Sequence, residues 1–273
     1  MPEGPEVRRQ TTKLQIDCTG AAIIDMTILS GRYIRQDQAD TSGLSFFQRK
    51  CPHHILSVDC KGKFIYFELE DGTCLFSTLG MSGNWTNKPD KYSRIKFRLH
   101  TDDLLYYNDQ RNFGTFKWTN AEALTKKLAS LGPDPLQDTI YISEFKDRLL
   151  AKDRTMAETL MDQSVFSGIG NYLKAEILWC ARISPHRKTS ELTDEEIKAL
   201  YRIIPSIMIE SYGVGQGSSL TTYRRIHEDL ELLYPGERTL AVYRQLSDPL
   251  GNPIQSEETK DRRKTWWVPK VQK

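Results

Sequence analysis

The chain has 273 residues, of which 38% are hydrophobic and 27% charged, a composition that excludes a disordered or fibrous protein. Its length corresponds to about two domains, each able to bury a hydrophobic core, and its formal net charge is only +2. No run of about 18 apolar residues is present, which excludes a membrane-spanning helix, and the start lacks the apolar segment of a signal peptide. We therefore expect an intracellular protein of the cytoplasm or nucleus, without contact to a membrane.

Five cysteines are spread along the chain without a Cys-x-x-Cys pair. A structural zinc site usually needs four Cys or His ligands in closely spaced pairs. Cys51 with His53 and His54 is the nearest approach to such a set, and it lacks a second pair. The sequence therefore predicts reduced thiols and no bound metal.

The first half of the chain predicts one helix followed by a mostly β domain. Pro5 precedes an apolar pattern typical of a helix start. Segments rich in β-branched and aromatic residues follow, separated by Gly, Asp and Asn, at 21–29, 54–70, 73–78, 93–100 and 104–108. Short strands punctuated in this way favour an antiparallel sandwich or barrel, which we expect to end near Trp118.

The second half predicts helices. Helical patterns cover 121–131, 142–151, 155–162, 172–182 and 194–212, and the Leu-Gly-Pro-Asp-Pro-Leu segment at 131–136 suits an interdomain linker. Residues 213–237 show little periodicity and are predicted as a mobile surface loop. Two last strands, near 239–246 and 264–269, are expected to form a hairpin across 248–253. Residues 260–273 contain six Lys and Arg against one acid, which weakly favours contact with a polyanion.

The N-terminus offers a reactive group. Removal of Met1 would make Pro2 a free secondary amine, which can attack an aldehyde-like carbon and form an iminium. Glu3 beside it could carry a proton to or from the reacting atoms. The alternative is an ordinary helix start, which explains Pro5 and Glu6 better than Pro2 and Glu3.

Six short motifs in the same order resemble the formamidopyrimidine-DNA glycosylase/endonuclease VIII family of base-excision repair enzymes. They are Met-Pro-Glu-Gly-Pro-Glu at 1–6, Lys-Gly-Lys-Phe at 61–64, Leu-Gly-Met-Ser-Gly at 79–83, Asp-Gln-Arg-Asn-Phe-Gly at 109–114, the linker at 131–136, and Gly-Ile-Gly-Asn-Tyr-Leu at 168–173. The resemblance implies an α+β protein with an N-terminal antiparallel β-sandwich domain (1–118), a linker (119–136), a helix–two-turns–helix domain (137–238) and a β-hairpin finger (239–273).

The resemblance also implies a role for each matching residue. The catalytic set would be Pro2, Glu3, Lys63 and Arg263. The DNA-binding set would be Glu6, Met81, Arg111, Phe113, Gly170, Asn171 and Arg262. Of these, Met81, Arg111 and Phe113 match the side chains that fill the space left by a flipped base.

Local sequence supports two of these assignments. The glycines beside Met81 and Phe113 favour exposed turns over core positions for both side chains. Gly168 and Gly170 would let a phosphate approach the amides at a helix N-terminus, with Asn171 adding a hydrogen bond. The alternative for Asn171 is an ordinary helix cap.

The finger departs from the bacterial pattern, in which four cysteines bind zinc, because no cysteine follows Cys180. The ending resembles the zincless finger of some eukaryotic and viral relatives, which needs no metal. Arg263 is the preferred match to the family's finger arginine, with Arg262 as the alternative. No metal or organic cofactor is expected.

The resemblance implies a monomeric, bifunctional DNA glycosylase and AP lyase acting on double-stranded DNA with oxidised bases or abasic sites. A Schiff base at Pro2 would release the base, and β,δ-elimination would cut the strand. We expect oxidised pyrimidines and hydantoins as preferred lesions; the alternative is an oxidised-purine glycosylase. Two alternative hypotheses for the function are a catalytically silent paralogue that binds damaged DNA and an RNA-binding β-sandwich protein.

Overall fold

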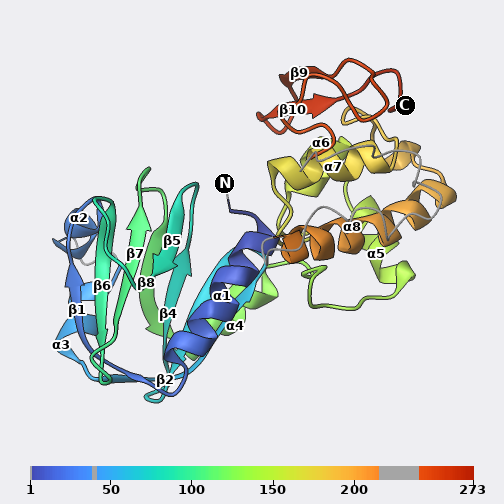
Figure 1. Ribbon diagram of the computed structural model, residues 1–273. Helices are drawn as coiled ribbons and strands as arrows, with labels where there is room; N and C mark the ends of the chain where they lie inside the picture. The colour runs from blue at the N-terminus through green and yellow to red at the C-terminus, as the bar shows by residue number, and fades with distance from the viewer. Residues whose placement is uncertain (1, 39–41, 215–239) are drawn as a thin grey trace. The chain divides into compact units, whose positions relative to one another are not determined.

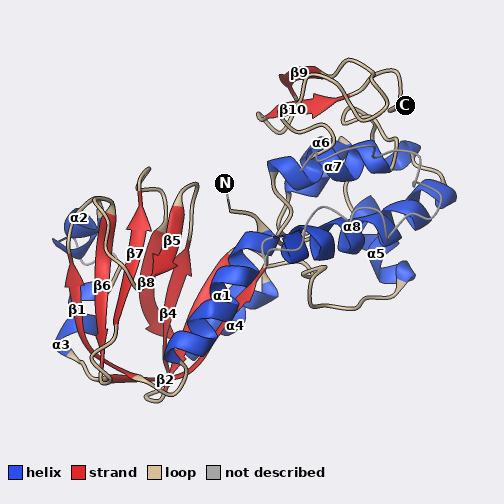
Figure 2. Cartoon of the chain, in the orientation of Figure 1, coloured by secondary structure: helices blue, strands red, loops and turns tan. Residues whose placement is uncertain are grey.

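The computed structural model describes residues 2–38, 42–214 and 240–273. The chain forms two compact units, residues 1–130 and residues 131–273 (Figure 1). The first is rich in strands and the second in helices (Figure 2), which confirms the expected α+β class. None of the helices in the described ranges is long and apolar enough to cross a membrane.

The first unit is built on one antiparallel sheet of eight strands in the order β5-β7-β6-β1-β2-β3-β4-β8. Although β5 and β8 end that order, Trp85 of β5 and Phe116 of β8 lie with ring centroids 5.6 Å apart. The sheet therefore folds back on itself around one core, as expected for a sandwich. The strands are β1 Ala22–Ile28, β2 His53–Lys61, β3 Phe64–Leu69, β4 Thr73–Thr78, β5 Gly83–Thr86, β6 Ser93–Leu99, β7 Leu104–Asp109 and β8 Thr115–Asn120.

Helix α1 (Gly4–Cys18) covers this sheet and begins where the sequence predicts. Its apolar face, which includes Val7 and Leu14, is buried in the sheet core. On its other side, Arg8 donates to the Asp59 carboxylate of β2 at 2.8 Å and to the Cys60 carbonyl oxygen at 2.8 Å. The helix that carries the N-terminus is thereby fixed to the sheet.

Several short elements of the first unit were not predicted. They are the strands β5 and β8 and the helices α2 (Tyr33–Gln38) and α3 (Leu44–Arg49). The segment predicted as continuous at 54–70 is divided into β2 and β3 by a turn at Gly62, whose φ is 58°. Helix α4 (Ala121–Ala129) packs on β4 and β8 and belongs to this unit.

The helices of the second unit enclose their own core, and each was predicted to within a few residues. They are α5 Ile142–Leu150, α6 Met156–Met161, α7 Asn171–Cys180 and α8 Asp194–Val214. A short 3-10 helix at Thr189–Glu191 was not predicted. Helix α7 ends in a Schellman motif, in which Ile183 N donates to the Leu178 carbonyl oxygen at 3.0 Å. Arg182 takes the left-handed position of this motif, with φ 58°. Most of the predicted loop at 213–237 lies outside the described residues.

The finger is a hairpin of β9 (Gln255–Glu258) and β10 (Lys264–Trp267). The second strand was predicted, but the predicted partner strand near 239–246 is wrong for residues 240–246, which form turns. Their amides are engaged elsewhere: N–H groups of Ala241, Val242 and Tyr243 donate to the buried Glu176 carboxylate of α7 at 2.7, 3.0 and 2.8 Å.

The predicted hairpin turn at 248–253 is also wrong, because the strands are joined by the turn at residues 259–263. Residues 248–253 form a separate loop around the buried Asp248. Its carboxylate accepts hydrogen bonds from the N–H groups of Leu250 and Asn252 at 3.0 and 2.7 Å. Such a side chain satisfies the loop amides that a strand partner would otherwise bond.

Candidate functional site

Pro2 and Glu3 stand at the start of α1, where Glu3 is the N-cap residue. Glu3 is fully buried, and its carboxylate accepts the Glu6 N–H in a capping box. In return, Glu3 N donates to the Glu6 carboxylate at 2.9 Å. The helix N-terminus thus holds one carboxylate directly beside Pro2, in a position that the helix dipole favours.

Glu6 has a structural role within the same helix. Besides accepting from Glu3, its carboxylate forms an ion pair with Arg9 at 3.0 Å. These contacts match the helix-start interpretation for Glu6, while its expected contact with DNA stays a prediction.

Lys63 lies in the turn between β2 and β3, next to Gly62, and its side chain is half-buried. The sequence predicts a lysine within a strand, whereas the strand ends at Lys61. Lys63 therefore lies outside the strand ladder, in the turn that joins β2 to β3.

The three predicted void-filling side chains occur on two adjacent loops, 79–83 and 109–114. Phe113 is 50% exposed, Arg111 is exposed and Met81 is half-buried. The Arg111 guanidinium lies 5.2 Å from the centre of the Phe113 ring, a cation–π contact. A half-exposed phenylalanine is not part of the core, as the neighbouring glycines predict.

A buried carboxylate joins these two loops. Asp109 is fully buried and accepts a hydrogen bond from the Ser82 hydroxyl on the first loop. It also accepts from Gly114 N on the second loop at 2.8 Å. Ser82 in turn accepts from Arg111 N at 2.8 Å. Sequence reasoning missed both Ser82 and Asp109, although each lies inside a motif string.

Close backbone contact reinforces this link. A Cβ atom on Gly80 would lie 2.6 Å from Gly114 N, and one on Gly114 would lie 1.7 Å from the Tyr107 hydroxyl. Burial raises the pKa of that hydroxyl, which donates to the Thr78 carbonyl oxygen at 3.0 Å. No other residue type fits at these two positions, so the loops are held at a fixed separation.

A second group of predicted residues lies in the helical unit, at the start of α7. Gly170 is the N-cap residue, which rules out the ordinary cap for Asn171. The loop before it is held by Gln163, which donates to the Ile169 carbonyl oxygen at 2.9 Å and accepts from Gly168 N at 3.0 Å. Amides at a helix start ordered in this way are suited to bind an anion.

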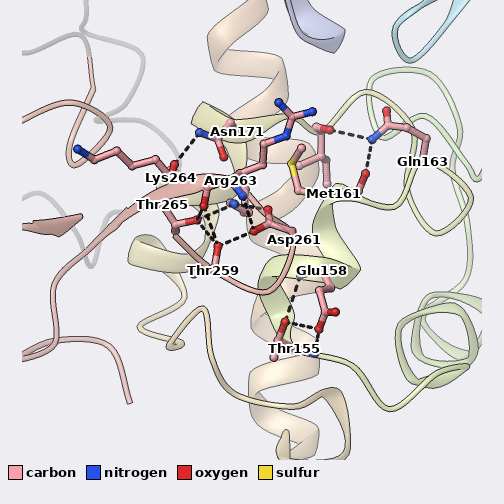
Figure 3. Close-up of polar contacts among 12 residues, drawn as sticks. Thr155, Glu158, Met161, Gln163, Asn171, Thr259, Asp261, Arg263, Lys264 and Thr265 are labelled. Carbon is pink, nitrogen blue, oxygen red and sulfur yellow. Dashed lines mark hydrogen bonds and ion pairs between the residues drawn. The ribbon is translucent and has the colours of Figure 1, made fainter. Parts of the chain in front are cut away.

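Asn171 connects this helix start to the finger. Its Nδ2 donates to the Lys264 carbonyl oxygen of β10 at 2.9 Å (Figure 3). Its Oδ1 has no hydrogen-bond partner within the described ranges. Each amide nitrogen has two hydrogens, so the bond to Lys264 uses only one of the two N–H groups of Asn171.

The predicted finger arginines lie in the hairpin turn and are exposed. Arg262 N donates to the Thr259 carbonyl oxygen at 2.8 Å, and Thr259 N donates to the Arg263 carbonyl oxygen at 3.1 Å. Arg262 takes the left-handed conformation with φ 56°, a position that usually carries glycine. The two arginines are therefore fixed in different backbone conformations.

Zinc does not fit the finger of this chain. The sequence has no cysteine after Cys180, and the described residues contain no group of three or more His, Cys, Asp or Glu placed to hold a metal ion.

Comparison with known proteins covers nearly the whole chain. Residues 1–116 match the formamidopyrimidine-DNA glycosylase N-terminal domain, residues 131–223 the H2TH domain and residues 234–273 the C-terminal domain of the same enzymes. The formamidopyrimidine-DNA glycosylase of Listeria monocytogenes is 30% identical over 100% of both chains. That of Streptococcus pyogenes is 32% identical over 82% of both.

Solved structures show the same fold. The MutM (Fpg) protein of Thermus thermophilus is 29% identical, with a TM-score of 0.80 over 99% of this chain and 98% of that one. The Lactococcus lactis enzyme, bound non-covalently to DNA with an AP site, is 23% identical, with a TM-score of 0.81 over 99% of both chains.

Proposed function

The chain belongs to the formamidopyrimidine-DNA glycosylase family, and we propose from this that its N-terminal proline is the nucleophile of base excision. Members of the family are DNA glycosylases with AP lyase activity, so this protein is a DNA-binding enzyme of base excision repair. The observation that supports the proline is its position beside a buried, oriented carboxylate at the start of α1.

The reaction begins with attack of the Pro2 nitrogen on C1′ of the damaged nucleotide, while the base departs and takes up a proton. The sugar ring then opens: the C1′–O4′ bond breaks and O4′ takes up the proton that the Pro2 nitrogen releases. The iminium formed in this way withdraws electrons and acidifies the hydrogens on C2′. Loss of one of them breaks the 3′ C–O bond, and a second elimination breaks the 5′ bond. Glu3, one residue from Pro2, is the group that moves these protons.

The lesion must leave the base stack before this chemistry can start. Phe113, Arg111 and Met81 are suited to replace the lost stacking, since they lie on two loops held at a fixed separation by Asp109. Asn171 and Arg263 supply hydrogen-bond donors for DNA phosphates, and Lys63 supplies a further positive charge. DNA binding should therefore weaken steeply with rising salt.

We propose oxidised pyrimidines and hydantoins as the preferred lesions, on the basis of the cysteine-free finger. The names of the Listeria monocytogenes and Streptococcus pyogenes relatives favour the alternative, ring-opened purines. Single-turnover excision of thymine glycol, guanidinohydantoin, formamidopyrimidine and 8-oxoguanine from otherwise identical duplexes decides between them. Faster excision of both purine lesions would contradict the pyrimidine preference.

Borohydride trapping on a duplex with one abasic site tests the nucleophile. Protein whose free Pro2 amine is verified by mass spectrometry should form a covalent complex. Protein extended by one residue, in which the Pro2 nitrogen is an amide, should form none. Pro5→Ala is the matched control, since it changes a proline of the same helix away from the amine. Equal trapping by the extended form would refute Pro2, and no trapping by any form would favour a silent damage-binding protein.

A further inference from the structure

The finger hairpin is too small to keep its place alone. Each of its strands has four residues, and every residue of β9 is exposed. Isolated two-stranded hairpins are marginally stable at best in water. Its position must therefore come from contacts with the rest of the helical unit.

A buried ion pair provides one such contact. Lys174 of α7 donates from Nζ to the Asp261 carboxylate of the finger turn at 2.6 Å, and the two side chains are 0% and 5% exposed. Lys174 also donates to the Thr265 hydroxyl of β10 at 2.7 Å. The Thr265 hydroxyl lies 2.6 Å from that of Thr259, which donates to Asp261 (Figure 3). One lysine thus bonds both the turn and the second strand of the hairpin.

A buried ion pair of this kind contributes little to the free energy of unfolding but favours one orientation of the finger. Removing two charges from water costs several kcal/mol per ion, and their attraction often does no more than offset this. Removing one partner, however, leaves a buried charge without compensation. The pair therefore penalises every placement of the finger in which Lys174 and Asp261 do not meet.

The ion pair acts most directly on Arg263. Arg263 N donates to Asp261 at 3.4 Å. The Arg263 carbonyl oxygen accepts from Thr259 N at 3.1 Å and lies 3.2 and 3.4 Å from the hydroxyl oxygens of Thr259 and Thr265. The next residue, Lys264, is bonded through its carbonyl oxygen to Asn171. Both polar groups of the Arg263 backbone therefore belong to the network around Asp261. Figure 3 shows the arginine side chain extending away from Asp261, on the side where Asn171 lies.

We propose that Lys174 and Asp261 are positioning residues that hold Arg263 in register with Asn171 for binding of the DNA backbone. The inference rests on the proposed DNA-binding role of Arg263. It gives this cysteine-free finger a means of fixing its arginine that needs no metal.

Salt-dependent binding of a duplex with a tetrahydrofuran abasic analogue tests the proposal without requiring catalysis. The logarithm of the DNA-binding constant falls linearly with the logarithm of the salt concentration, and loss of one phosphate contact makes this slope less steep by about 0.9. Arg263→Ala should show this loss, and Lys174→Met should show the same loss with binding weakened about tenfold. Lys174→Met combined with Arg263→Ala should bind no worse than Arg263→Ala alone. The proposal would be overturned if the losses of affinity in the two single variants multiplied in the double variant. It would also be overturned if Lys174→Met bound DNA as tightly as the wild type does.

Two further variants separate positioning from folding. Lys188→Met is the matched control, because it removes a half-exposed ion pair with Asp153 of the same unit, and it should bind like the wild type. Lys174→Met with Asp261→Leu removes both charges and should keep the thermal unfolding midpoint while the lower salt slope persists. A restored slope in this folded variant would show that the ion pair positions nothing.

Measurements on the wild type separate the proposed Pro2 chemistry from the proposed positioning of Arg263 by Lys174 and Asp261. Binding without borohydride trapping would contradict the proposed chemistry while the coupling between Lys174 and Arg263 is still measured. Absence of duplex binding by the wild type would contradict both.

Discussion

Asp109 accepts hydrogen bonds from both loops that carry the candidate void-filling side chains, through Ser82 on one and Gly114 on the other. At the scale of single residues, this carboxylate is the point at which the two loops depend on each other. A buried acceptor that loses its charge leaves donors without a partner, at a cost of about 1–3 kcal/mol each. The position of the exposed side chains that we propose to contact DNA therefore depends on this one buried carboxylate.

We expect Asp109→Asn to slow excision of a lesion from duplex DNA about tenfold, because one amide N–H of the new side chain must face a loop donor. The free energy of unfolding should fall by roughly 2 kcal/mol. Single-turnover excision and urea unfolding measure the two effects. Asp71→Asn is the matched control, since the Asp71 carboxylate accepts from Thr73 in the turn between β3 and β4 instead of bonding the two loops. A similar loss of excision in the control would contradict a specific role for Asp109.

The sequence allowed the exposed members of the site to be predicted but not their supports. Phe113 could be placed outside the core because glycines flank its loop, and half of its side chain is exposed. Ser82 and Asp109 have no such local signal. Their bond joins residues 27 positions apart, and a pairing of that kind follows only from the strand register.

At the scale of elements, α7 binds two segments of the C-terminal region that lie far from it in the sequence. Glu176 of this helix receives the N–H groups of residues 241–243, while Lys174 of the same helix bonds the finger turn. Burial raises the pKa of Glu176, and the three backbone donors oppose that rise. One helix thus fixes two segments that follow it by more than sixty residues.

We expect Glu176→Gln to free residues 241–243, because an amide offers one acceptor oxygen where the carboxylate offers two. The free energy of unfolding of the helical unit should fall by about 2–3 kcal/mol. Amide hydrogen exchange at 241–243 should accelerate more than tenfold. Glu195→Gln, at the exposed start of α8, should change neither quantity. Unchanged exchange in Glu176→Gln would show that other contacts hold the segment.

This arrangement explains which elements could be predicted. The helices of the second unit follow from apolar periodicity, a local property, and were placed correctly. Residues 240–246 carry a strand-like composition, yet Glu176 takes up their amides and prevents a ladder. The first strand of the hairpin, β9, is polar and fully exposed, so it carries no apolar alternation by which a strand is normally recognised.

At the scale of the whole molecule, the two units have separate hydrophobic cores. Each can therefore respond to a change in conditions by itself. The helical unit contains Glu210, a buried carboxyl near the end of α8 whose Oε1 has no hydrogen-bond partner among residues the structure describes. Burial raises the pKa of Glu210 to about 8.

We expect the helical unit to lose stability as the pH rises from 5 to 8. The folded state binds the Glu210 proton more tightly than the unfolded state does. The resulting contribution to the free energy of unfolding is therefore complete below the pKa of the unfolded state and is lost as the pH rises to the pKa of the folded state. The loss should be about 1–2 kcal/mol, allowing for solvent screening. Glu210→Gln should reduce this dependence in calorimetric unfolding and leave the part due to Glu176, whose pKa is also raised by burial, while the β unit stays unaffected. An equal pH dependence in the variant would assign the effect to another group.

Two of the three arginines with positive φ in the described residues lie where stability and positive charge place opposite demands on the side chain. Arg182 after α7 and Arg262 in the finger turn occupy backbone positions where glycine is the usual residue, at φ 58° and 56°. A side chain there costs about 1 kcal/mol or more. Replacing both by glycine would give a sturdier protein that carries two fewer positive charges for a polyanionic substrate. A designer seeking a heat-resistant repair reagent would thus do better to change Arg182 first and leave the finger turn as it is.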